Sequence, residues 1–88
     1  MEKEVEVINK LGLHARAAAK LVKLCANYES HIMLYKGEKG VDAKSIMGVL
    51  MLAATQGTTL SLHVEGGDAE DASDSILALF GGCFDEGE

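Results

Sequence analysis

The sequence predicts an α+β fold in which one sheet has a single buried face and three helices cover that face. Four short segments alternate apolar and polar residues, which is the pattern of strands with one face buried. Three further segments repeat apolar residues at helical spacing. The order along the chain is βαββαβα, with no sign of a linker or internal repeat. We therefore expect one domain over residues 1–88, near the small end of what folds alone.

The N-terminal part of the chain is expected to form a strand, a loop and a helix. Residues 2–8 alternate acidic residues with Val5 and Val7, which should point inward. Residues 9–13 read as a loop. A helix should follow from Ala15 to about Tyr28. Its apolar stripe comprises Ala18, Leu21, Val22, Cys25 and Tyr28.

A hairpin is expected next. Residues 31–36 form its first strand, with Ile32 and Leu34 on one face. Residues 37–40 carry two glycines and provide the turn, and residues 41–43 form the short second strand. The other face of the first strand should present His31, Met33 and Tyr35.

The C-terminal half should contain two more helices around one strand. Residues 45–54 form an almost wholly apolar helix with Ser45 as its N-cap. Residues 59–64 alternate strictly and form a strand. Asp68 should cap the last helix, with Asp71 three residues on in a near match to a capping box. The apolar stripe of that helix comprises Ala72, Ile76, Leu79 and Phe80.

The charge distribution of the chain disfavours some classes of function. The net charge is −6, yet residues 1–44 hold all eight Lys and Arg against six acidic residues, and residues 45–88 hold eight acidic residues alone. A nucleic-acid binder is usually basic, so that class is disfavoured. An acidic protein partner facing the N-terminal half, or a merely solubilising acidic half, both fit this split.

No segment is long and apolar enough to span a membrane, and the N-terminus lacks the apolar region of a signal peptide. We therefore expect a cytoplasmic protein without membrane insertion. The two cysteines do not form a disulfide framework. Cys25 lies in a helical apolar stripe, where a buried, inert thiol is expected.

His14 is the strongest candidate for chemistry. It ends the loop after Gly12 and directly precedes a helix, whose first amides and dipole favour an anion. Arg16 can add a guanidinium suited to phosphate oxygens. A neutral imidazole is a competent nucleophile near neutral pH. Position alone leaves a simpler alternative open, in which His14 only caps the helix.

The remaining histidines, His31 and His63, lie on the outward faces of strands and read as ordinary solvated side chains. No ligand spacing joins them to His14 in a metal site. We expect no metal and no cofactor. A self-contained enzyme with a deep pocket is also hard to build from 88 residues.

The apolar helix over residues 45–54 is expected to be a docking surface. A short helix buries one face, so some of its apolar residues must stay exposed, which is typical of partner contact. The alternative is a wholly buried helix in which Ser45 is only a cap. The residues we assign to docking are Ile46, Met47 and Leu50, with Lys20, Lys23 and Lys44 as a basic rim.

Two runs of the chain resemble the signatures of the HPr family, the phosphocarriers of the bacterial phosphotransferase system. Residues 12–16, Gly-Leu-His-Ala-Arg, are similar to its active-site signature, and residues 44–49, Lys-Ser-Ile-Met-Gly-Val, to the region of its regulatory serine. Their spacing and the βαββαβα order also match, so the resemblance covers essentially the whole chain.

The resemblance implies an open-faced β-sandwich: a four-stranded antiparallel sheet with three helices on one side. It implies that His14 accepts a phosphoryl group from enzyme I, ultimately from phosphoenolpyruvate, and passes it to a IIA domain. Arg16 would stabilise that group. Ser45 would be the regulatory position, which an HPr kinase/phosphorylase modifies in some bacteria. The protein would be a monomeric carrier rather than an enzyme.

Two departures and one alternative qualify this expectation. Ala17 stands where the family usually has proline, and Ala is an excellent helix former, so little loss is expected. Gly81 and Gly82 should stop or fray the last helix near Phe80. The alternative is a regulatory binding module of the same fold that acts through Ser45 and its docking surface. Known modules of that kind lack the active histidine, whereas this chain has it.

Overall fold

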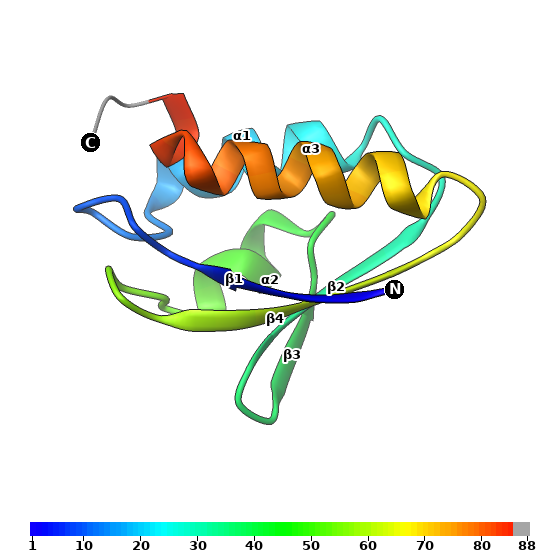
Figure 1. Cartoon of the computed structure of the whole chain (residues 1–88). Helices are drawn as coiled ribbons and strands as arrows, with labels where there is room; N and C mark the ends of the chain where they lie inside the picture. The colour runs from blue at the N-terminus through cyan, green and yellow to red at the C-terminus, as the bar shows by residue number, and fades with distance from the viewer. Residues whose placement is uncertain (86–88) are drawn as a thin grey trace.

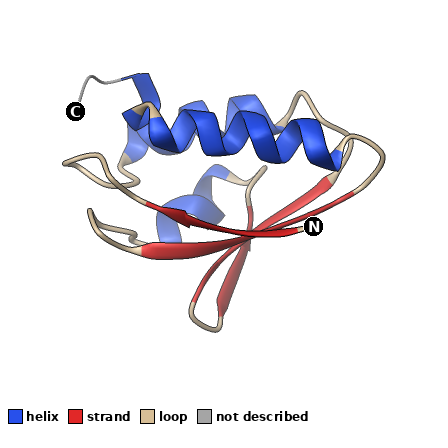
Figure 2. Cartoon of the chain, viewed as in Figure 1, coloured by secondary structure: helices blue, strands red, loops and turns tan. Residues whose placement is uncertain are grey.

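The computed structural model describes residues 1–85 of the chain, so the end of the expected domain, residues 86–88, lies outside the described range. A four-stranded antiparallel sheet in the order β1-β4-β2-β3 carries three α-helices on one face (Figures 1 and 2). The predicted α+β class and element order are confirmed. The strands are β1 (Glu2–Glu6), β2 (His31–Lys36), β3 (Lys39–Asp42) and β4 (Thr59–Glu65); the helices are α1 (Ala15–Cys25), α2 (Ile46–Met51) and α3 (Ala69–Gly81).

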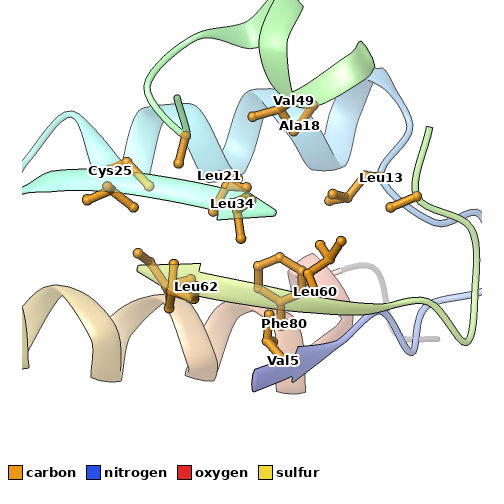
Figure 3. Close-up of a cluster of buried hydrophobic side chains, with 14 of the residues drawn as sticks. Val5, Leu13, Ala18, Leu21, Cys25, Leu34, Val49, Leu60, Leu62 and Phe80 are labelled. Carbon is orange, nitrogen blue, oxygen red and sulfur yellow. The ribbon is translucent and has the colours of Figure 1, made fainter. Parts of the chain in front are cut away.

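An aliphatic core fills the space between the helices and the sheet. Figure 3 shows Phe80 of α3 beside Leu60 of β4 and Val5 of β1, and Ala18 of α1 beside Val49 of α2. The expected inward alternation is confirmed, because Val5, Ile32, Leu34, Leu60, Leu62 and Val64 are all buried. Cys25 is also buried, as predicted, and burial raises the pKa of its thiol to about 12. That thiol is therefore protonated at neutral pH and unreactive.

Several element boundaries differ from the predicted ones: β1 ends at Glu6 instead of residue 8, and β4 extends one residue further, to Glu65. Two other differences follow from local turn chemistry. The hairpin closes over two residues, Gly37 and Glu38, since Lys36 already pairs with Lys39. The third strand therefore starts at Lys39 instead of Val41. Helix α1 ends at Cys25, short of Tyr28, where the chain turns toward β2.

Helix α2 is shorter than the predicted span of residues 45–54. Ser45 is the N-cap as expected, but the last helical residue is Met51. Ala53 adopts a left-handed conformation with φ 50°, which ends the helix. The freed carbonyls find other donors: the Leu52 carbonyl accepts from Lys36 Nζ at 3.2 Å, and the Met51 carbonyl accepts from Lys39 Nζ. Lysine side chains thus replace the helical amides that a longer helix would have supplied.

Asp68 stands at the N-cap of α3, but the predicted capping bond is wrong, because its side chain makes no bond to the helix. The carboxylate instead accepts from the N–H of Glu29 at 2.9 Å and the N–H of Ser30 at 3.0 Å, and from the Ser30 hydroxyl. Two backbone amides before β2 had no helical or strand partner, so they compete successfully for the carboxylate. Asp68 therefore joins the start of α3 to the start of β2.

These bonds give a pH-dependent contribution to stability. They hold the pKa of Asp68 below its ordinary value, first through the Ser30 hydroxyl and then through the backbone amides. The contribution is complete above the unfolded pKa of about 4 and is lost as pH falls through the lower folded value. We expect Asp68→Asn to lower the midpoint of thermal unfolding at pH 7, and the difference from wild type to shrink in acid. Circular dichroism melts from pH 7 to pH 2 measure this; a difference independent of pH would contradict it.

The end of α3 follows the sequence prediction, since the helix stops at Gly81, one residue after Phe80. A single 3₁₀ turn then runs over Cys83–Asp85, with all three residues in the left-handed region. Phe84 is fully buried there and packs edge-on against Phe80, with ring centroids 4.8 Å apart. The buried ring fixes the turn against the core. None of the helices within residues 1–85 has the length and apolar character needed to cross a membrane.

Candidate functional site

The loop before His14 is held rigidly from inside. Asn9 is buried, and its side-chain amide donates to the Gly12 carbonyl at 2.7 Å while the Gly12 N–H donates to the Asn9 carbonyl at 3.1 Å. The Leu13 N–H donates to the Ala54 carbonyl at 2.9 Å. These bonds join the loop to the segment after α2. Asn9 is not among the residues predicted to form the site. Asparagine side chains in short loops often bond to nearby backbone groups, and that tendency could have indicated its role.

Gly12 is required by both conformation and space. Its φ is 68°, in the left-handed region that glycine adopts without cost. A Cβ at this position would lie 2.4 Å from the Ala54 carbonyl oxygen and 2.9 Å from Thr55 Cα. Only glycine therefore allows the loop to approach the segment after α2 this closely, and that approach sets where His14 enters the helix.

His14 is the N-cap of α1. Its backbone is extended, with φ −76° and ψ 178°, and its carbonyl already accepts the first helical bond, from the Ala18 N–H at 2.8 Å. The ring nitrogen Nδ1 accepts from the Arg16 N–H at 3.3 Å. An accepting nitrogen carries the lone pair, so this contact corresponds to the tautomer with the proton on Nε2. Nδ1 thus faces the positive end of the helix, and the half-buried ring remains partly open to solvent.

The side chain of Arg16 is exposed, in the first turn of α1. Its backbone N–H contacts the ring of His14, which leaves its guanidinium available for a separate task. The first turn of α1 contains no acidic residue. An anion attached to His14 Nδ1 would therefore meet helix amides and a guanidinium, with no carboxylate from that turn to repel it.

Ser45 caps α2, and its Oγ accepts from the Gly48 N–H at 3.1 Å. The two residues that follow are exposed, Ile46 by 37% and Met47 by 65%. Leu50 is half-buried, and Val49 alone in α2 is buried. The apolar excess in this helix thus reaches the surface beside Ser45, which the fully buried alternative does not allow.

The predicted basic rim is split between two places. Lys20 and Lys23 line an open hollow between α1 and α3, together with Leu24, Asn27, Leu79 and Asp85. Lys20 Nζ donates to the Phe84 carbonyl there. Lys44 lies next to Ser45, and its Nζ donates to the Tyr28 carbonyl at 2.7 Å. Lys44 therefore belongs to the surroundings of α2, whereas Lys20 and Lys23 belong to the groove between α1 and α3.

Two further apolar residues are exposed near the site. Leu11, in the loop braced by Asn9, is 67% exposed, and Met51 at the end of α2 is 59% exposed. The Ala54 carbonyl bonded to Leu13 places the end of α2 next to that loop. The other histidines lie on strands β2 and β4, and residues 1–85 contain no cluster of three or more His, Cys, Asp or Glu able to hold a metal ion.

Comparison with known proteins gives consistent matches over the whole chain. A family model described as the PTS HPr component phosphorylation site matches residues 1–81. The phosphocarrier protein HPr of Cupriavidus necator is 49% identical over 88 residues, which is 100% of this chain and 99% of that protein. The HPr of Pseudomonas aeruginosa is 49% identical over 86 residues, 97% of this chain and 96% of that protein. The crystal structure of HPr-C-His from Thermoanaerobacter tengcongensis has a TM-score of 0.94 and 41% identity, and the match covers 98% of this chain and 97% of that one.

Proposed function

Because this chain belongs to the HPr family of phosphocarrier proteins, we propose that His14 is the residue on which it carries the phosphoryl group. The chain is a carrier in the phosphotransferase system and not itself a catalyst. The observation that supports His14 is the bond from the Arg16 N–H to its Nδ1 at the start of α1. That bond holds Nδ1 at the N-terminal end of α1, where a transferred anion is best stabilised.

The transfer proceeds by in-line attack. As the bond from the Arg16 N–H to His14 Nδ1 is released, the freed Nδ1 lone pair attacks the phosphorus of the phosphorylated donor; a P–N bond forms as the bond to the donor's leaving group breaks. The Nε2 proton stays on the ring during the attack, so both ring nitrogens are then substituted and the ring is an imidazolium cation, whose positive charge partly offsets the phosphoryl charge. The phosphoryl charge, about −1.5 to −2, lies against the helix amides and beside Arg16. Passing the group to the next protein reverses the same steps.

The partners we propose are enzyme I as donor and a IIA domain as acceptor. Both would dock on the apolar residues beside Ser45, namely the exposed Ile46 and Met47 and the half-buried Leu50, to which the exposed residues Leu11 and Met51 add area. Lys44 supplies a nearby cation, and Lys20 and Lys23 a second basic area in the α1–α3 groove. We further propose that Ser45 is a regulatory phosphorylation site where the host has an HPr kinase/phosphorylase.

We propose that the carrier works as a single-domain monomer, because His14 and Arg16 meet at the start of one helix and need no second copy to complete the site. We also propose that it works in the cytoplasm. The alternative, a regulatory module acting through Ser45 alone, is not favoured. It does not require a nucleophilic nitrogen held at the N-terminus of α1, which this chain has.

The direct experiment is incubation of the chain with enzyme I and phosphoenolpyruvate, followed by intact-mass measurement. We expect the mass to rise by one phosphoryl group and to return to the starting value after brief exposure to acid, because phosphoramidates are acid-labile. Fragmentation under neutral conditions should locate the group on His14. A phosphoryl group that survives acid, or that maps to a serine, would contradict the proposal.

Arg16 should matter more to the transferring group than to the resting protein. Its loss removes one charge-assisted contact worth about 1.5–3 kcal/mol, so Arg16→Ala should slow transfer by about one to two decades. Arg16→Lys should recover part of the rate, since lysine keeps the charge but lacks the planar fork. Stopped-flow transfer rates measure this at saturating enzyme I, where weaker docking no longer contributes. Wild-type rates in Arg16→Ala would exclude the role.

A further inference from the structure

The face of the sheet that the helices leave uncovered holds a second group of reactive side chains. Ser61 Oγ lies 2.9 Å from His63 Nε2, two residues further along β4. His63 Nδ1 lies 3.8 Å from the Glu2 carboxylate, on the neighbouring strand β1. A hydroxyl, an imidazole and a carboxylate thus follow one another in the order found at serine nucleophiles, where a base contacts the hydroxyl and an acid orients the base.

The sheet fixes this spacing. β4 is paired with β1 on one edge and with β2 on the other, so its backbone cannot shift to separate Ser61 from His63. Glu2 is directly opposite His63 in the register of β1 and β4. The carboxylate favours a proton on Nδ1, which leaves the Nε2 lone pair free to accept from the Ser61 hydroxyl.

An aromatic neighbour restricts the imidazole further. The ring of Tyr35 on β2 contacts the ring of His63, with centroids 4.6 Å apart. Tyr35 has room to lie there because its partner on β3 is Gly40, where a Cβ would come within 2.4 Å of the tyrosine ring. Gly40, Tyr35 and His63 therefore form a row that limits rotation of the imidazole. His63 remains reachable, with 36% of its side chain exposed.

We propose that Ser61 is a nucleophilic modification site that accepts acyl groups from activated esters of small carboxylic acids. Ser61 Oγ attacks the carbonyl carbon; the new C–O bond forms as the bond to the leaving alcohol or phenol breaks. The hydroxyl proton moves to His63 Nε2 and from there to the leaving group. His63 is the general base and Glu2 the positioning residue.

The product is a persistent acylserine. Because β4 is paired on both edges, its amides are engaged in the sheet and do not converge on the carbonyl oxygen as an oxyanion hole would. The site therefore reacts once per molecule, because no oxyanion hole speeds hydrolysis of the acyl ester. It is independent of His14, which lies on the helix layer at the start of α1.

The experiment uses p-nitrophenyl acetate as the acyl donor and locates acetyl groups by peptide fragmentation. Ser75 is the internal reference, because its hydroxyl contacts the Tyr28 hydroxyl at 2.6 Å, a phenol in place of the imidazole that contacts Ser61. We expect Ser61 to be acetylated at least about tenfold faster than Ser75, a modest share of what a positioned base contributes. Equal rates at the two serines would overturn the proposal.

Matched variants test whether His63, and not another group on this face of the sheet, is the base. His63→Gln should lower Ser61 acetylation about tenfold or more, whereas His31→Gln, on the same face of the sheet, should leave it unchanged. Glu2→Gln should lower it less than His63→Gln. Unchanged acetylation in His63→Gln, or acetyl found on His63 without transfer to Ser61, would refute the mechanism; where that variant does not fold, the ratio of Ser61 to Ser75 in wild type decides.

The pH profile gives a readout that a purely structural role would not change. A protonated His63 has no lone pair on Nε2 and cannot accept the proton of Ser61. The ratio of Ser61 to Ser75 acetylation should therefore fall on acidification in wild type and stay constant in His63→Gln. A ratio independent of pH in wild type would count against the base. The titratable groups around His63 are Glu2 and Glu4 on β1, Tyr35 and His31 on β2, and Glu65 on β4.

Discussion

His14→Ala is expected to take up no phosphoryl group from enzyme I and phosphoenolpyruvate, under conditions in which the wild-type chain is fully labelled. The substitution removes the ring whose Nδ1 lies at the start of α1, and no neighbouring group of the first helical turn can replace that nucleophile. The fold should survive, because losing an N-cap side chain costs about 0.5–2 kcal/mol. Intact-mass measurement and a circular dichroism melt on the same sample test both parts.

His31→Ala is the matched control for this prediction. His31 is exposed on β2, outside the helix layer that carries His14, so its loss should leave labelling complete. Full labelling of His14→Ala, or loss of labelling in the control, would show that the phosphoryl group is carried elsewhere. A variant that fails to fold would be replaced by His14→Gln, which keeps a polar side chain at the cap.

Ser45→Asp is expected to slow phosphoryl transfer to His14 markedly, by a factor of about ten or more, which corresponds to about 1.4 kcal/mol. Aspartate is as good an N-cap as serine, and negative charge is tolerated at the start of a helix. Its effect should fall on docking, because the charge is next to the exposed side chains of Ile46 and Met47. An acidic partner would repel it, and an apolar contact would have to desolvate it.

Stopped-flow transfer and thermal melts measure the two sides of this prediction. The circular dichroism spectrum of Ser45→Asp should be unchanged, and the midpoint of its thermal unfolding should lie within a few degrees of wild type. Thr59→Asp adds the same charge on the uncovered face of the sheet and should transfer at the wild-type rate. Met47→Ala should weaken docking without unfolding. Wild-type transfer by Ser45→Asp at several ionic strengths would place docking elsewhere, and loss of its fold would make Ser45 only a structural cap.

The fold was predictable because periodicity dominates in the long elements. Strict alternation in β4 and the apolar stripe of α1 each identify a buried face without reference to distant residues. Where the prediction was wrong, distant backbone groups decided the outcome. Asp68 was expected to cap α3, but the free amides of Glu29 and Ser30, far away in the chain, bind it instead. No local pattern encodes that competition.

Local sequence also predicted the position of the candidate site but not the role of the residues around it. The position was predictable because His14 and Arg16 lie within three residues at a predicted helix start. The role of the lysines could not be predicted from charge counts. Lys20, Lys36, Lys39 and Lys44 all donate to backbone carbonyls at the ends of helices or turns. Much of the basic character of the first half of the chain therefore serves the fold, and the partner surface is narrower than the charge split suggested.

The side of the sheet that carries Ser61 has a consequence for how this carrier meets other proteins. Outward positions of β1 and β4 hold Glu2, Glu4, Glu6 and Glu65, and the first turn of α3 adds Glu70 and Asp71. Arg16, Lys20 and Lys23 belong to α1, and the side chains of Lys36 and Lys39 bond to the end of α2. The molecule thus has a dipole moment that runs from the acidic face of the sheet and α3 toward α1 and α2, in addition to its net charge of −6. An approaching acidic protein would rotate it so that α1 and α2 face the encounter, before any contact forms. Collisions are thereby oriented toward His14, and added salt weakens this steering within a Debye length of about 8 Å at physiological ionic strength.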